Sequence, residues 1–125
     1  MRPNTDRDSN DFLLERHGDA LIVTPTGSIE NLQWSAVEQA AELVLGPLDS
    51  HRAPLVVFDL GHLQIFGSVF LALLLRCQKL VRTHGGEMVL CCLTPAARQL
   101  LQLTRVDSLW AIYETRPEAL EALGS

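Results

Sequence analysis

The sequence predicts one α/β domain: a mixed sheet of four to five strands with about four helices. The chain has 125 residues and 47% hydrophobic content, which suits a single domain with one core. Two runs, 54–60 and 87–93, are almost entirely apolar, as is typical of strands buried on both faces of a sheet. A long helical segment separates them, and a strand, a helix and a strand in this order indicate a parallel βαβ unit.

The N-terminal third predicts a hairpin and a helix. The strand-like runs 12–16 and 20–26 flank a glycine-containing turn at 17–19, which is the pattern of two antiparallel strands. Residues 32–45 then place apolar side chains on one broad face of a helix, and the Gly-Pro pair at 46–47 stops it.

The centre of the chain predicts the central strand of the sheet and the long helix that follows it. Run 54–60 is expected to be the central strand, and it leads through the loop 61–66 into a helix that begins at Ser68 and ends before Gly85. Serine is a preferred N-cap, because its side-chain oxygen can accept a hydrogen bond from a free backbone N–H. On residue chemistry alone, the N-cap is the favoured role of Ser68. The first half of this helix has no polar face, so its own fold or a partner must cover it.

The last third predicts two further helices and a short strand. The pair at 94–95, a threonine followed by a proline, marks the start of a helix that ends near 104–105. Residues 108–113 are a short strand candidate, and the segment 115–118 caps a last helix over 118–123.

Composition excludes several classes of function. The formal net charge is −5 and the basic residues are scattered, which argues against a nucleic-acid partner. No apolar run reaches the roughly 18 to 20 residues of a membrane helix, and the N-terminus lacks a signal-peptide core. We therefore expect a cytoplasmic protein without membrane insertion. The polar residues 1–10 are expected to be a disordered leader before a domain over 11–125.

The three cysteines are Cys77, Cys91 and Cys92. An odd number with two neighbours is a poor disulfide framework. Adjacent strand residues point to opposite faces of a sheet, so Cys91 and Cys92 are not expected to share a metal ion. The sequence predicts buried thiols, with no metal and no cofactor.

The sequence contains no complete set of nucleophile, base and orienting group for an enzyme. His62 precedes Ser68 in the sequence, but there is no nucleophile elbow and no third group to orient a base. Asp59 ends the central strand, where a structural hydrogen bond to the next loop is favoured over a metal site. The glycine pair 85–86 is not followed by the lysine of a phosphate loop. We therefore expect a protein that is not an enzyme.

Three short motifs follow one another along the predicted βαβ unit: Asp59-Leu60 at the strand end, Ser68 and Leu71 in the helix start, and Gly85-Gly86 before the next strand. With these motifs, the order of elements resembles the STAS domain, and within it the single-domain bacterial anti-sigma-factor antagonists. Segment 103–109 also resembles the late helix end and turn of that family. The resemblance covers about residues 11–123.

The loop after the hairpin carries a second part of the resemblance. Residues 27–30 are similar to the family's Gly-x-Leu-Asp loop, with Glu30 in the acidic position. The sequence departs from the family pattern in two ways. Gly67 stands where the family usually has Asp, and the pair 69–70, Val-Phe, replaces a small residue and Gly.

The resemblance implies a regulatory module whose partner is an anti-sigma factor of the serine kinase type. That kinase would phosphorylate Ser68 and thereby release the antagonist. The expected partner-binding residues are Gly27, Ser28, Glu30, Asn31, Ile65, Phe66, Gly67, Val69 and Phe70. The alternative function is a constitutive STAS subunit of a larger complex, such as a stress-signalling scaffold or a lipid transporter, without a phosphorylation switch.

Overall fold

The structure is a computed structural model that describes residues 12–27, 29, 32–46 and 53–124. The predicted leader, and Ser28, Glu30 and Asn31 of the predicted partner surface, lie outside the described residues.

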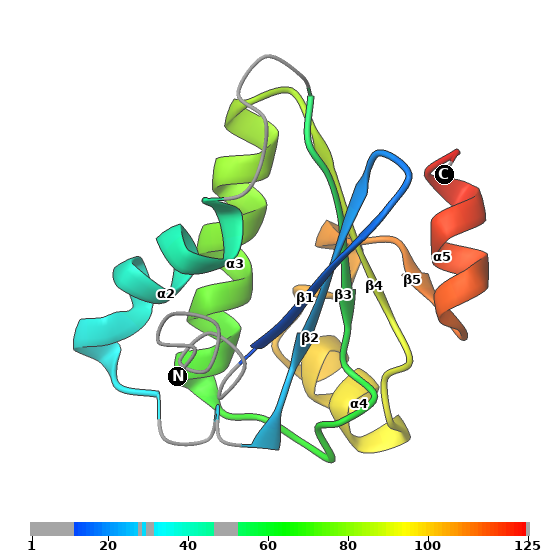
Figure 1. Ribbon diagram of the computed structural model, residues 1–125. Coiled ribbons are helices and arrows are strands. Elements are labelled where there is room, and N and C mark those ends of the chain that lie inside the picture. Colours follow the sequence, from blue (N-terminus) through cyan, green and yellow to red (C-terminus); the bar gives the residue numbers. More distant parts are fainter. Residues whose placement is uncertain (1–11, 28, 30–31, 47–52, 125) are drawn as a thin grey trace, which may run out of the picture.

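Five strands form one sheet (Figure 1). They are β1 Phe12–His17, β2 Ala20–Pro25, β3 Leu55–Asp59, β4 Glu87–Cys91 and β5 Ile112–Tyr113. The spatial order follows the sequence, β1-β2-β3-β4-β5. β1 pairs antiparallel with β2, and β2 to β5 run parallel. The predicted mixed sheet, the hairpin and the central position of β3 are confirmed.

Four α-helices are present among the described residues. They are α2 Val37–Leu45, α3 Ser68–Thr83, α4 Pro95–Leu103 and α5 Arg116–Ala122. The 3-10 turns η2 Trp34–Ala36 and η3 Asp107–Leu109 complete the architecture. The parallel unit β3, α3, β4 is confirmed.

The helices cover the two faces of the sheet unequally. α2, α3 and α4 share one apolar core with the sheet, whereas α5 packs on the opposite face with a smaller cluster, and Figure 1 shows α2 and α3 across the sheet from α5. β3 serves both cores, because alternate side chains point to opposite faces. Val56 and Phe58 face the larger core and Val57 faces α5.

Two predicted elements begin several residues later than expected. The helix expected over 32–45 begins as the 3-10 turn η2, and the α-helix proper starts only at Val37. The strand expected over 108–113 is mostly not a strand, because η3 occupies 107–109 and only Ile112 and Tyr113 pair with β4. The α-helix and strand contents are therefore smaller than the apolar patterns indicated.

The predicted caps at the last two helices are confirmed. The Thr94 side chain accepts a hydrogen bond from Ala97 N at 3.1 Å, and Pro95 follows it in the first turn. Thr115 and Glu118 form a complete capping box at the start of α5. Each satisfies backbone N–H groups that the helix itself leaves unpaired.

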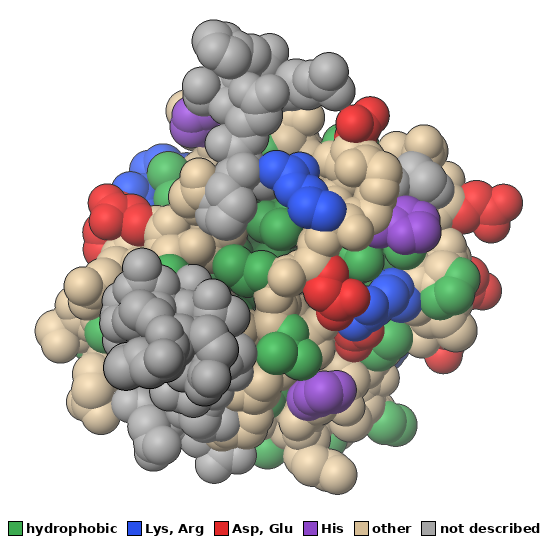
Figure 2. Space-filling model, in the orientation of Figure 1, with side chains coloured by type: hydrophobic (Ala, Val, Ile, Leu, Met, Phe, Trp, Pro, Cys, Tyr) green, Lys and Arg blue, Asp and Glu red, His purple; other side chains and the backbone are tan. Residues whose placement is uncertain are grey.

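The folded chain shows the scattered charges and the lack of a long apolar helix that the sequence indicated. Figure 2 shows acidic and basic side chains interspersed over the face in view. Within the part of the chain that the structure describes, no helix is both long and apolar enough to cross a membrane.

Each glycine of the pair after α3 is required for a different structural reason. Gly85 has φ of +76°, the left-handed conformation that commonly ends a helix. Gly86 donates from its N–H to Val81 O at 2.9 Å and lies against the backbone of Pro54. A Cβ atom at Gly86 would overlap the carbonyl oxygen and ring of Pro54. This close approach lets β4 begin beside β3, where Glu87 N donates to Pro54 O at 2.8 Å.

We predict that Gly86→Ala lowers the free energy of unfolding by about 2 kcal/mol or more, because the backbone of Pro54 must move. Urea denaturation followed by circular dichroism measures this loss. Gly27→Ala is the matched control, since a Cβ there meets nothing within 4 Å. Equal stability of the two variants would contradict the prediction.

Candidate functional site

Ser68 is the first residue of α3, and it is solvent-exposed. The residue before it, Gly67, is the N-cap, with φ of −100° and ψ of −169°. The prediction that Ser68 is the N-cap is therefore wrong by one position. The physical reason is the path of the loop, which stays extended through Gly67, so that Leu71 N donates to Gly67 O at 3.1 Å and Ser68 is already helical.

This shift changes what the Ser68 hydroxyl can do. An N-cap serine uses its side-chain oxygen within its own helix, whereas no hydrogen bond joins the Ser68 hydroxyl to another described residue. The first turn of α3 also carries no acidic side chain. The hydroxyl thus lies exposed at the positive end of a 16-residue helix.

The loop between β3 and α3 is anchored at both ends. Leu63 is buried and its N–H donates to Leu60 O at 3.1 Å, which forms a turn directly after the strand. Further along, the Thr94 hydroxyl donates to Gln64 O at 2.6 Å. The same hydroxyl caps α4, so the loop is tied to the start of that helix. These hydrogen bonds fix the position of the loop that leads to Ser68.

The apolar neighbours of Ser68 divide into supporting and exposed residues. Phe66 and Phe70 are buried, with ring centroids 5.0 Å apart in an edge-on arrangement. Val69 is half-buried, whereas Ile65 is 54% exposed. Of these four predicted partner residues, Ile65 offers the large exposed apolar surface, and the two phenylalanines fix the shape beneath it.

The loop after β2 packs next to the start of α3. A hollow of about 390 Å³ is lined by Ile29, Ile65, Phe66, Gly67 and Phe70. Ile29 is buried and belongs to the loop that contains Gly27, which is exposed. The structure thus brings together the two segments that the resemblance named separately. Ile29 was missed, although an apolar residue inside a polar loop was its signal.

Asp59 lies at the end of β3 with both carboxylate oxygens engaged. Oδ1 accepts from Gly61 N at 3.0 Å, and Oδ2 accepts from Arg116 Nε at 3.0 Å. The favoured role of Asp59, a structural hydrogen bond to the following loop, is confirmed. The sequence did not indicate its partner Arg116, whose NH2 group also donates to Thr24 Oγ1 at 3.1 Å. Thr24 and Asp59 are the buried polar side chains among the described residues.

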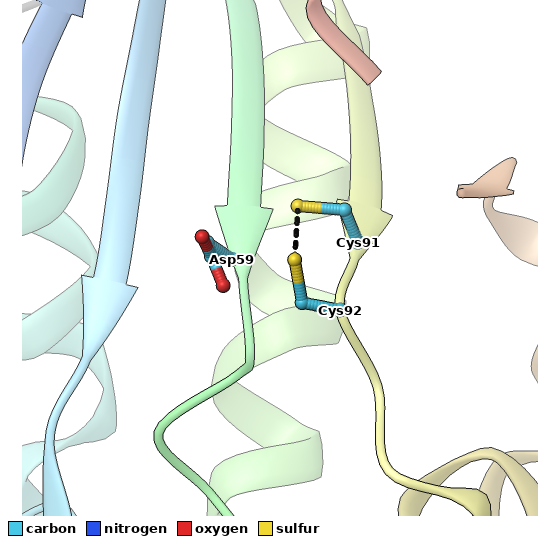
Figure 3. A group of neighbouring side chains, drawn as sticks. All are labelled: Asp59, Cys91 and Cys92. Carbon is cyan, nitrogen blue, oxygen red and sulfur yellow. Dashed lines mark hydrogen bonds between the residues drawn. The ribbon is translucent and has the colours of Figure 1, made fainter. Parts of the chain in front are cut away.

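All three cysteines are free thiols. Cys77 and Cys91 are buried, as predicted, whereas Cys92 is only partly buried, contrary to the prediction. Burial raises the pKa of Cys77 to about 12. The expectation that Cys91 and Cys92 point apart is wrong. β4 ends at Cys91, and Cys92 has φ of +66°, so the two Sγ atoms lie 3.6 Å apart. Figure 3 shows both sulfur atoms on the side that faces Asp59.

Comparison with known proteins identifies relatives over nearly the whole chain. The family model described as the STAS domain matches residues 11–119. An anti-sigma F factor antagonist of Paenibacillus polymyxa is 26% identical over 110 residues, which cover 88% of this chain and 92% of that protein.

Two solved structures are similar in both sequence and fold. An anti-sigma-factor antagonist (STAS) domain protein from Planctomyces limnophilus has 29% identity and a TM-score of 0.78, covering 92% of this chain and 99% of that chain. An anti-sigma factor antagonist from Mycobacterium paratuberculosis has 26% identity and a TM-score of 0.71, covering 91% of this chain and 93% of that chain.

We predict that Arg116→Met lowers the free energy of unfolding by about 2 to 4 kcal/mol, because it leaves the Asp59 carboxylate largely buried without its cation. Arg98→Met is the control, since Arg98 pairs with the exposed Glu114 at 3.7 Å and such surface pairs contribute less than about 1 kcal/mol. Chemical denaturation of both variants measures the difference, and a similar loss in each would rule out a special role for the Asp59 pair.

Proposed function

The chain belongs to the STAS domain family, and from this premise we propose that it is an anti-sigma-factor antagonist whose partner is an anti-sigma factor of the serine kinase type. The proposed contact surface is the start of α3 together with the loop of Gly27 to Asn31. The observation that carries the proposal is the exposed Ser68 hydroxyl, which has no hydrogen-bond partner among the described residues. Ser68 directly follows Gly67, which lines the hollow together with Ile65.

Phosphorylation of Ser68 is the proposed switch. A phosphate adds a charge of about −1.5 to −2 at neutral pH. At the first position of α3 this charge meets unpaired backbone N–H groups and the positive helix end, so it does not oppose the fold. The switch therefore acts on the contact with the partner and leaves the domain folded.

The cost of phosphorylation arises at the interface. When a partner covers Ile65 and the adjoining hollow, it removes water from the space next to Ser68. A phosphate there loses hydration unless the partner supplies cations, and each 1.4 kcal/mol of lost binding energy lowers the affinity about tenfold. In this proposal Ser68 is the substrate of the partner kinase, and the chain acts as a regulator and not as an enzyme.

We predict that Ser68→Glu weakens binding of the anti-sigma factor at least about tenfold, whereas Ser68→Ala binds like wild type. Affinity capture from the source cells, followed by mass spectrometry, identifies the partner, and calorimetry with the purified partner measures the affinities. Ser108→Glu, at an exposed serine in η3, is the charge-matched control.

The same experiment distinguishes the alternative function. Retention of one set of partners by wild type and by Ser68→Glu alike would contradict the switch. That result would favour a constitutive subunit of a larger complex.

We predict that Ser68→Glu leaves the stability of the domain unchanged or raises it by about 0.3 to 1 kcal/mol, because the first turn of α3 has no acidic side chain. Thermal unfolding at low salt measures this. A clear loss of stability would show that weakened partner binding arises from the fold, and it would argue against an interface switch.

We predict that Ile65→Asp weakens partner binding by about tenfold or more, because it places a charge in the centre of the apolar contact. Leu103→Asp is the matched control, since Leu103 is 74% exposed on α4. Both variants should unfold close to the wild-type midpoint, because both side chains are exposed. Equal affinity of the two variants would place the partner elsewhere.

A further inference from the structure

We propose that Cys91, Cys92 and Asp59 form a binding site for a thiophilic divalent cation of the zinc class. The site lies where β3 and β4 end, and it is independent of the proposed partner contact at Ser68. One ligand atom from each residue, two Sγ atoms and a carboxylate oxygen, lies within 4.8 Å of the other two. Figure 3 shows the two sulfur atoms projecting from the end of β4 toward the end of β3, where Asp59 lies.

The spacing of the sulfur atoms suits a tetrahedral ion. Two thiolates bound to one zinc ion at about 2.3 Å lie roughly 3.8 Å apart. The Sγ atoms of Cys91 and Cys92 lie 3.6 Å apart. Two of the three ligand atoms are thus already at the separation that such an ion requires, and a side-chain movement of about an ångström brings in the carboxylate.

The backbone holds this arrangement in place. A positive φ is uncommon for a residue other than glycine, yet Cys92 has φ of +66°. Its N–H donates to Tyr113 O at 3.2 Å, and Leu60 N donates to Cys91 O at 3.0 Å. The neighbouring strands on both sides therefore stabilise the turn that brings the two thiols together.

The net charge of the site stays the same when a divalent cation replaces the two thiol protons. Without a metal, the Arg116 guanidinium pairs with the Asp59 carboxylate at 3.0 Å and with the Glu15 carboxylate at 3.5 Å. A divalent cation that displaces one proton from each thiol adds two positive and two negative charges, and the two protons leave to solvent. The net charge of this half-buried cluster is unchanged, so Arg116 need not leave.

The type of cation follows from the donors. Thiolate ligands favour zinc-class ions over magnesium or calcium, which prefer oxygen. Arg116 Nε and Gly61 N already orient the two carboxylate oxygens, as outer partners of metal ligands do.

Access to the site is open beside Gly61. Gly61 is exposed and Cys92 is partly exposed. A Cβ atom at Gly61 would lie 3.1 Å from Asp59 Oδ1 and 3.4 Å from Cys92 Cβ. The absence of a side chain here leaves the ligands room to move inward, and the fourth position of the ion remains for solvent.

The test uses the reduced full-length protein with Zn²⁺ and Co²⁺. Competition with a chromophoric chelator gives the zinc affinity and stoichiometry, and cobalt absorption reports thiolate ligation. We expect one ion per chain, with charge-transfer absorption from two thiolates. Cys92→Ser should lower the affinity about a hundredfold or more, since even outer partners contribute 10- to 100-fold.

Two further variants make the result specific. Cys77→Ala removes a buried thiol of the other core and should bind zinc like wild type. Gly61→Ala retains every ligand and should weaken binding about tenfold by crowding them. Circular dichroism verifies that each variant is folded. Wild-type affinity in Cys92→Ser, equal loss in Cys77→Ala, absence of thiolate-to-cobalt absorption, or a Cys91–Cys92 disulfide in reducing buffer would each overturn the proposal.

Discussion

The buried carboxylate of Asp59 is the constraint on which the arrangement of the site depends. A charge removed from water requires compensation by hydrogen bonds and a counter-charge. Gly61 N and Arg116 Nε supply both, each at 3.0 Å. Because Arg116 is the first residue of α5 and Gly61 begins the loop toward α3, one carboxylate positions the start of the last helix and the path toward Ser68. The energetic cost of burying Asp59 is thereby linked to the geometry of the proposed partner surface.

The same edge of the sheet carries both proposed sites. Parallel strands end together, and loops that follow them are where α/β proteins place their functional groups. Cys92 lies two residues before Thr94, whose hydroxyl holds Gln64 in the loop before Ser68. A bound cation changes partner affinity only if it binds two conformations of this loop with different affinity. The structure describes one conformation of this loop, and the two sites are proposed as independent.

The sequence predicted the fold well where local interactions determine it. The β3–α3–β4 unit follows from two apolar runs around a long helix, and the threonine caps of α4 and α5 follow from neighbouring residues. The prediction failed where distant pairing decides. Residues 108–113 have the composition of a strand, but only Ile112 and Tyr113 pair with β4. The N-cap of α3 is Gly67 and not Ser68 because of the path of the preceding loop. A helical pattern in the sequence carries no information about that path.

The site was less predictable than the fold for a physical reason. Periodicity describes residues inside regular elements, and the residues that define the two sites lie where regularity ends. Cys92 was assigned to the opposite face because β4 was assumed to continue through it, whereas its φ of +66° turns the side chain back. Arg116 lies 57 residues from Asp59 in the chain, a pairing without a repeat or a motif. Gly67 has open space beside it, so packing does not forbid the acidic residue that the family usually places there. Packing thus leaves the residue next to Ser68 open to substitution, whereas Asp59 is fixed by its contacts with Gly61 and Arg116.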